Sequence, residues 1–256
     1  MKPLSHDRLA EALVTEAELF GTTIAGAGPD VRVPTCPEWT LRELTCHVGL
    51  AYHKSAAIIA GRPTGYVPFD AVTVDDPPGF EALGDWLLDG AERLVAVVAE
   101  VGPETPTSTW SPDRRAGFWT RRLTHETVVH RADAAFATGA PYDVDADVAA
   151  DGISEGLDLA AVFSRLGHPA LDRTSLRGTG ETLLFHATGS GLRWLVRRTP
   201  SGAEVSHEAA EADVVVEGRA ADLLLALTER LAADDRRLTV SGDAALFRHW
   251  RENTRF

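Results

Sequence analysis

Three side chains in this sequence have the types and the spacing to bind a divalent metal ion. Glu126 and His130 are four residues apart in a segment with helical periodicity, which places both on one face, one turn apart. His47 belongs to an earlier helical segment and lies about 40 to 60° around the helix from the apolar positions Leu44 and Ala51. We therefore expect His47 to point toward the interior of a helical bundle.

The helix that carries Glu126 and His130 has a polar strip within its apolar face. On a helical wheel Arg122, Glu126, His130 and Asp133 fall within about 80° of one another. An isolated charge in a bundle core costs several kcal/mol, and a divalent cation would satisfy one carboxylate and two neutral imidazoles together. Two histidines and one carboxylate leave a fourth tetrahedral position open, which is typical of catalytic rather than structural zinc.

Other interpretations of these residues remain open at this stage. The pattern E-x-x-x-H also occurs by chance on helices, and a lone interior histidine is usually only hydrogen-bonded. Asp133 could orient a ligand or transfer a proton as a catalytic residue, or be an ordinary carboxylate. A structural zinc site would need Asp133 or a cysteine as fourth ligand, and Cys46 falls on the opposite side of its helix, as does His53.

Two arginines and a cysteine near these positions have weaker functional interpretations. Arg122 and Arg131 could hold a substrate carboxylate, although charged helix positions are more often solvated. Cys36 precedes a proline and is better interpreted as a packing residue than as a nucleophile.

The first part of the chain contains four amphipathic segments separated by loops rich in proline and glycine. The pattern predicts helices at about 5–26, from residue 40 onward, at about 80–98 and at about 117–138. Thr40 and Glu43 form a T-x-x-E capping box that marks one helix start, and Gly139 stops the last helix. We expect a four-helix bundle over residues 1–144.

After residue 145 the sequence predicts a smaller α+β domain over 145–256. A helix at 148–166 is followed by β-rich segments at 182–188 and 192–198, which Gly189-Ser190-Gly191 would join in a hairpin. A strand at 212–217, a helix at 221–232, a strand at 238–243 and a short final helix complete the expected domain.

Composition limits the classes of partner. The formal net charge is -13 and the isoelectric point is near 5.1, which argues against nucleic acid or an acidic membrane surface as a partner. The N-terminal segment lacks the apolar core of a signal peptide, and no stretch approaches membrane-spanning length. With only Cys36 and Cys46, we expect a protein of the reducing cytoplasm. The sequence does not specify an oligomeric state.

Three stretches of the sequence resemble a known family. They are VPTCPEWTLRELTCH at 33–47, HETVVHRAD at 125–133 and VAADGISE at 148–155. Together they are similar to the mycothiol-dependent maleylpyruvate isomerase family, which belongs to the DinB-like metal-binding bundles. The resemblance implies that positions matching His47, Glu126 and His130 bind a divalent metal, and that the second domain is similar to sterol-carrier-protein-like folds.

The resemblance also implies a chemistry for the open coordination position. A low-molecular-weight thiol, mycothiol in actinobacteria, would bind zinc as a thiolate, because zinc lowers the pKa of a thiol. Addition of the thiolate to a small electrophile would lead to cis-trans isomerisation, as with maleylpyruvate, or to an S-conjugate in a transferase. The rival hypothesis is a non-catalytic protein that binds a small ligand and has a structural metal site.

Overall fold

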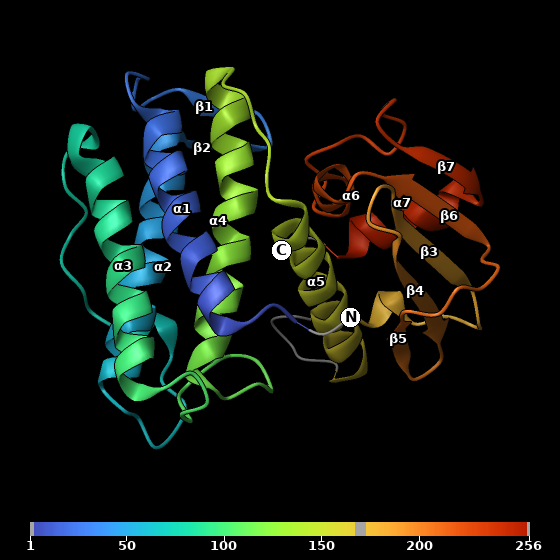
Figure 1. Ribbon diagram of the computed structural model, residues 1–256, viewed down its shortest axis with the longest axis horizontal. Coiled ribbons are helices and arrows are strands. Elements are labelled where there is room, and N and C mark those ends of the chain that lie inside the picture. Colours follow the sequence, from blue (N-terminus) through green and yellow to red (C-terminus); the bar gives the residue numbers. More distant parts are fainter. Residues whose placement is uncertain (1–2, 167–172, 255–256) are drawn as a thin grey trace. The chain divides into compact units, whose positions relative to one another are not determined.

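A computed structural model describes residues 3–166 and 173–254 of the chain. The chain divides into two compact units, one formed by Leu4–Tyr142 and the other beginning at Asp143. The first is helical and the second contains helices and a five-stranded sheet (Figure 1). This confirms the predicted fold class, a helical bundle followed by an α+β part.

Four long helices form the first unit, and in Figure 1 they run alongside one another. They are α1 (His6–Ile24), α2 (Leu41–Ala60), α3 (Leu83–Val101) and α4 (Ala116–Thr138). Helix α1 packs against α3 and α4, and α2 packs against the same two helices. The apolar stripes meet in a core that includes Phe20, Leu44 and Leu87, all fully buried. Four helices whose apolar faces converge in this way satisfy the bundle expectation.

The capping box forms as expected and fixes the start of α2. The Thr40 side chain accepts a hydrogen bond from the backbone N–H of Glu43, and the Glu43 carboxylate accepts one from the backbone N–H of Thr40 at 2.8 Å. Two of the unpaired donors at the helix start are thereby satisfied. At the far end of α4, Gly139 adopts φ 73°, the left-handed conformation that glycine tolerates best.

A short β-hairpin precedes α2, and the periodicity of the sequence did not predict it. Strand β1 (Arg32–Val33) pairs antiparallel with β2 (Cys36–Thr40), and Pro34 and Thr35 lie in the turn between them. The strands are too short for an alternating pattern to be recognised in sequence. Two short 3-10 turns, η1 (Phe69–Ala71) and η2 (Phe80–Ala82), lie in the connection from α2 to α3.

The second unit is built on a sheet of order β5-β4-β3-β6-β7. Its strands are β3 (Thr182–Ala187), β4 (Leu192–Thr199), β5 (Gly202–Ser206), β6 (Val214–Gly218) and β7 (Thr239–Gly242). Only the β3–β6 pair is parallel; the other neighbouring strands are antiparallel. The expected turn at Gly189-Ser190-Gly191 joins β3 and β4, and both glycines have positive φ.

Three helices and a 3-10 turn accompany this sheet: α5 (Ala146–Leu166), α6 (Ala220–Leu227), α7 (Ala244–Asn253) and η3 (Thr174–Leu176). Trp194 of β4 is fully buried, and its indole N–H donates to Ser154 Oγ of α5 at 2.8 Å. The sequence did not predict β5, because Gly202 at the start of this strand is typical of a turn. The helix expected at 221–232 is shorter in the structure, where α6 ends at Leu227.

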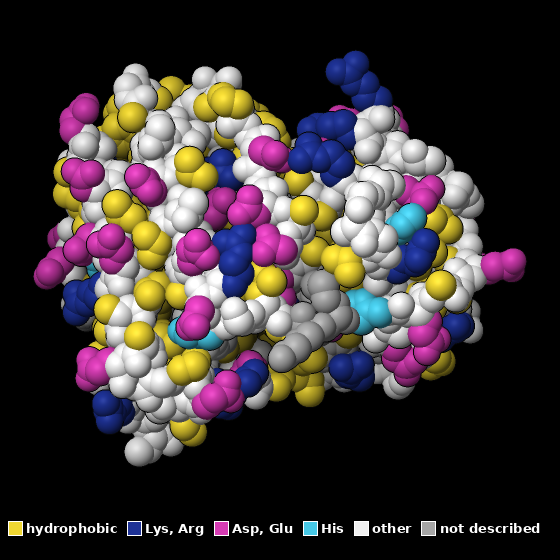
Figure 2. All heavy atoms as spheres, viewed as in Figure 1, with side chains coloured by type: hydrophobic (Ala, Val, Ile, Leu, Met, Phe, Trp, Pro, Cys, Tyr) yellow, Lys and Arg dark blue, Asp and Glu magenta, His cyan; other side chains and the backbone are white. Residues whose placement is uncertain are grey.

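No helix among the described residues is long and apolar enough to cross a membrane. On the face drawn in Figure 2, acidic side chains are distributed over much of the surface, in agreement with the formal net charge of -13.

Candidate metal centre

Helices α2 and α4 bring the three predicted ligands together. One ligand atom from each of His47, Glu126 and His130 lies within 4.8 Å of the other two. The two imidazole rings have their centroids 5.2 Å apart and are nearly perpendicular, at 82°. Nε2 of His130 lies 3.3 Å from Oε2 of Glu126. Donors on a tetrahedral zinc ion are about 3.4 Å apart, so small side-chain shifts would bring this set to metal-binding geometry.

The other ring nitrogen of His130 is held by Asp133. Nδ1 lies 2.8 Å from Oδ2 of Asp133, which is fully buried. Because a carboxylate accepts, this contact places a proton on Nδ1, so in the neutral ring the lone pair is on Nε2, on the side of Glu126 and His47. The hydroxyl of Thr35 donates to the other oxygen of Asp133 at 2.5 Å. The hairpin turn thus holds the carboxylate that orients His130.

The charges around Glu126 keep it ionised. Burial would raise its pKa, but Arg122, whose guanidinium lies 2.9 Å away, and His130 together hold the pKa well below its usual range. Burial would likewise lower the pKa of His130, yet its hydrogen bonds to Asp133 and Glu126 raise that pKa overall. The carboxylate of Glu126 stabilises a proton on Nε2 of His130, and a cation bound between these side chains would have to displace that proton.

His47 is more exposed than its position on the wheel indicated. We expected it to point into the bundle interior, but His47 is exposed. Its position on the flank of the apolar stripe explains the difference, since a flanking residue can face solvent. Neighbouring protein atoms and His130 still lower the pKa of His47, which favours the neutral imidazole that metals bind.

Trp39 covers the two histidines from the hairpin side. Its ring centroid lies 4.8 Å from that of His47 and 6.1 Å from that of His130. Thr35 and Cys36 come from the same hairpin, and Sγ of Cys36 lies 3.9 Å from Oδ2 of Asp133. Sequence reasoning missed the contributions of Thr35 and Trp39. Both residues lie just before the capping box and within twelve residues of His47 in the sequence, which was the available indication that they could lie near the site.

The remaining candidates lie elsewhere or have other partners. His53 stacks on Trp86 of α3 with centroids 4.7 Å apart, away from the three ligands. Arg131 is buried and donates to Glu16 of α1 at 2.6 and 3.2 Å, so its charge is already compensated. Cys46 is partly buried against the helical core and is not among the clustered donors.

Comparison with known proteins identifies the family of this chain. The N-terminal domain model of mycothiol maleylpyruvate isomerase matches residues 10–135, and the C-terminal domain model of the same family matches residues 147–249. The chain belongs to the mycothiol maleylpyruvate isomerase family. The family resemblance carried by the stretches around His47, Glu126 and His130 is thereby confirmed.

Solved structures of this family share the fold. The crystal structure of the mycothiol-dependent maleylpyruvate isomerase is similar with a TM-score of 0.62 and 15% sequence identity, covering 94% of this chain and 96% of that one. A crystal structure of a histidine-to-alanine mutant of that isomerase gives a TM-score of 0.60 at the same identity and coverage. No curated protein sequence matched the chain.

Proposed function

We propose that this protein is a metal-dependent enzyme that activates a low-molecular-weight thiol for addition to a small electrophile. The observation that carries the proposal is the clustering of His47, Glu126 and His130, with one donor atom each within 4.8 Å. Two imidazoles and a carboxylate are the donor set of catalytic zinc sites. Zinc is therefore the proposed metal, and mycothiol is the proposed thiol because of the family to which the chain belongs.

Each residue of the site has a distinct part in this proposal. A bound zinc ion would lower the pKa of a thiol at its open position and hold it as the nucleophilic thiolate. Glu126 supplies negative charge, and Arg122 keeps it ionised. Asp133 fixes the ring of His130 through Nδ1, so we propose it as a positioning residue for a ligand; its oxygens contact Thr35 and His130. Trp39 would restrict the directions from which an electrophile can approach.

The proposed reaction is cis-trans isomerisation of an unsaturated acid of the maleylpyruvate type. The thiolate sulfur would form a bond to one alkene carbon while the π electron pair moves onto the conjugated carbonyl as an enolate. The former double bond, now single, would rotate, and the returning pair would re-form the alkene and expel the sulfur, so that the thiolate is regenerated. If the adduct instead takes up a proton and is released, the outcome is an S-conjugate and the enzyme is a transferase. Metal site geometry is the same for both outcomes.

The first experiment measures metal content. Protein purified without chelators is expected to contain about one zinc per chain, and His130→Ala is expected to lose most of it. His207→Ala, a change at an exposed histidine of the second unit, serves as the matched control and should retain the metal. Equal metal content in the His130 variant and the control, or a wild-type protein that binds no zinc, would disprove the metal assignment.

The second experiment tests catalysis. Metal-loaded protein is incubated with mycothiol and a panel of cis-unsaturated acids and epoxides, and both isomer ratio and free thiol are followed. Isomerisation with constant thiol indicates the isomerase, and consumption of thiol indicates the transferase. No turnover of any compound, with zinc bound, would favour the alternative of a non-catalytic ligand-binding protein in which the metal is structural. Both oxygens of Asp133 already accept hydrogen bonds, from Thr35 and His130, which argues against Asp133 as a fourth metal ligand.

A further inference from the structure

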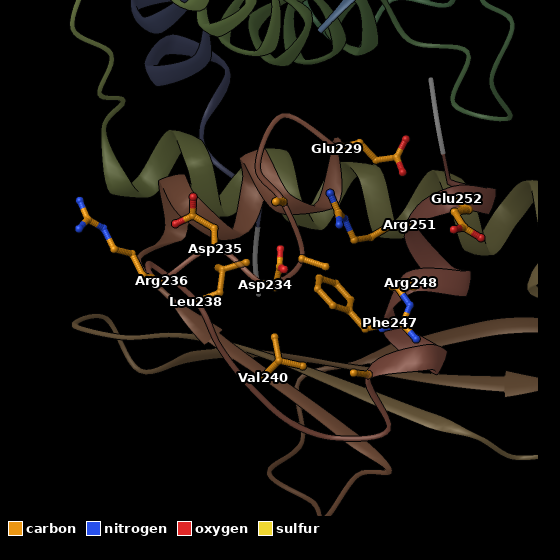
Figure 3. A pocket seen from close by; sticks show the side chains of 13 residues that line it. Glu229, Asp234, Asp235, Arg236, Leu238, Val240, Phe247, Arg248, Arg251 and Glu252 are labelled. Atoms are coloured by element: carbon orange, nitrogen blue, oxygen red, sulfur yellow. The ribbon is translucent and has the colours of Figure 1, made fainter.

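The second unit contains a pocket of about 620 Å3 that takes no part in the proposed chemistry. It lies between the segment that follows α6, strand β7 and helix α7 (Figure 3). Leu238, Val240 and Phe247 give it part of its lining as apolar side chains, and Figure 3 labels them together with the acidic side chains of the lining. Sites for small organic ligands have volumes of about 300 to 1,000 Å3 and combine apolar walls with a few polar groups.

The polar group that distinguishes this pocket is the guanidinium of Arg251. The residue is only 8% exposed and borders the pocket from α7. Nε donates to the carbonyl of Ala226 at 2.5 Å, and Nη2 donates to the carbonyl of Leu231 at 2.6 Å. The two carbonyls lie in the last turn of α6 and in the segment after it. Two of the three guanidinium nitrogens of Arg251 therefore have a structural role.

The third nitrogen of Arg251 has no such role. Nη1 has no acceptor among the described residues, and protein atoms do not fully enclose it. No carboxylate of the described chain lies within ion-pair distance of this guanidinium. The guanidinium lies 5.5 Å from the ring centroid of Phe247 and otherwise contacts neutral carbonyls. A buried charge without a close counter-ion is costly, and burial lowers the pKa of Arg251. The pocket therefore has an unused donor on a charge that lacks a close counter-ion.

The charged groups that line the pocket are of both signs, four carboxylates and three guanidiniums, and none of these carboxylates forms an ion pair with Arg251. Asp234 and Glu252 act on Arg251 only from beyond ion-pair distance. Asp235 is held by Arg237, with Nε 3.0 Å from its Oδ1. The lining also includes Glu229. Arg236 and Arg248 line the pocket as well, and the described structure contains no ion pair of either arginine. The two arginines add positive charge at the rim.

We propose that this pocket binds a small monocarboxylic acid with an apolar, preferably aromatic, body. The carboxylate would accept a hydrogen bond from Nη1 of Arg251 and provide its missing counter-ion, while the apolar body would contact Phe247, Leu238 and Val240. A carboxylate bound to guanidinium forms the stronger, charge-assisted type of hydrogen bond. The inference does not rest on the metal-dependent activity, because none of its residues belongs to the metal centre.

The test uses the full chain and measures binding by calorimetry. The probe is 1-naphthylacetate, and its neutral analogue 1-naphthylacetamide has nearly the same size. We expect one bound acid per chain and at least tenfold weaker binding of the amide. The same titration on His130→Ala excludes binding through the metal centre, and there the acid is expected to bind as before. Equal affinity of the acid and the amide, or loss of binding in His130→Ala, would overturn the proposal.

A pair of neighbouring substitutions locates the binding. Ala244 is exposed and borders the pocket, whereas the exposed Ala245 beside it does not. Ala244→Phe is expected to fill the pocket and weaken binding of 1-naphthylacetate at least tenfold, and Ala245→Phe should leave it unchanged. Arg251→Gln should weaken binding of the acid and leave binding of the amide unchanged. If Arg251→Gln does not fold, Ala244→Phe and Ala245→Phe still test whether the acid binds in this pocket. Equal binding by these two variants would refute the assignment.

Discussion

Asp133 accepts a hydrogen bond from Nδ1 of His130 at 2.8 Å while it receives the hydroxyl of Thr35 on its other oxygen. The carboxylate comes from the same helix as the histidine, and the hydroxyl comes from the turn of a hairpin almost a hundred residues earlier. The orientation of one proposed metal ligand therefore depends on contact between the hairpin and α4.

The first prediction concerns this orienting contact. Asp133→Asn should lower zinc affinity about 10- to 100-fold, because the amide holds the imidazole less firmly and makes it a weaker donor to the metal. Competition with a chromophoric chelator measures the affinity. Thr35→Val should produce a smaller loss in the same direction, and Thr35→Ser, which keeps the hydroxyl, should behave as wild type. Unchanged affinity in Asp133→Asn would show that the carboxylate does not support His130.

The second prediction concerns the close packing of α2 on α3. A Cβ built on Gly49 would lie 2.1 Å from a ring carbon of Trp86, so Gly49→Ala forces the indole to move. We expect the free energy of unfolding to fall by about 1 to 3 kcal/mol, as for other overpacked cores. Denaturant unfolding measures the change. Gly156→Ala in α5, where no atom lies within 4 Å of the added Cβ, should instead gain about 0.5 to 1 kcal/mol through helix propensity. Destabilisation by both changes would contradict this account.

The third prediction concerns the buried ion pair between α1 and α4. Glu16 and Arg131 are 6% and 4% exposed, and the guanidinium also lies over the ring of Tyr142 at 4.6 Å. Glu16→Ala removes the counter-ion of a buried charge and should cost about 3 to 5 kcal/mol of unfolding free energy. Glu104→Ala removes a partner of the exposed Arg115 and should cost less than about 1 kcal/mol. A similar small effect at both sites would mean that the buried pair is not needed for stability.

The fourth prediction concerns the pH dependence of stability in the second unit. Asp213 accepts hydrogen bonds from the backbone and the hydroxyl of Thr182 at 2.7 and 2.9 Å, and these bonds lower its pKa. A carboxyl whose pKa is depressed by folding stabilises the fold above its unfolded pKa of about 3.9 and loses that contribution as the pH falls through the folded pKa.

Asp213→Asn should therefore be less stable than wild type at pH 7, and the difference should shrink as the pH is lowered below about 4. Thermal unfolding followed by circular dichroism from pH 7 to pH 2 measures the two curves. Glu208→Gln, at an exposed residue of the same unit, controls for the loss of one negative charge. Parallel curves for Asp213→Asn and wild type over the whole range would refute the linkage.

The sequence alone was sufficient for the features that depend on neighbours along the chain. The i, i+4 spacing of Glu126 and His130 requires only that their segment be helical, and the capping box of Thr40 and Glu43 is a contact over three residues. Periodicity likewise located the four helices of the bundle, although α4 is buried around most of its circumference and includes charged side chains there. The family resemblance was available from short stretches around the same positions.

Tertiary structure decided which distant residues meet. The wheel showed that His47 flanks an apolar stripe, but only the packing of α2 beside α4 places it near His130, and the same packing leaves it exposed. Thr35 and Trp39 lie in a hairpin too short to produce a pattern, so their contacts with Asp133 and the histidines follow from the fold alone. Arg131 is one residue from His130 in sequence, yet it faces Glu16 of α1. Sequence spacing determines which residues share a face of one helix; only the packing of helices determines what that face meets.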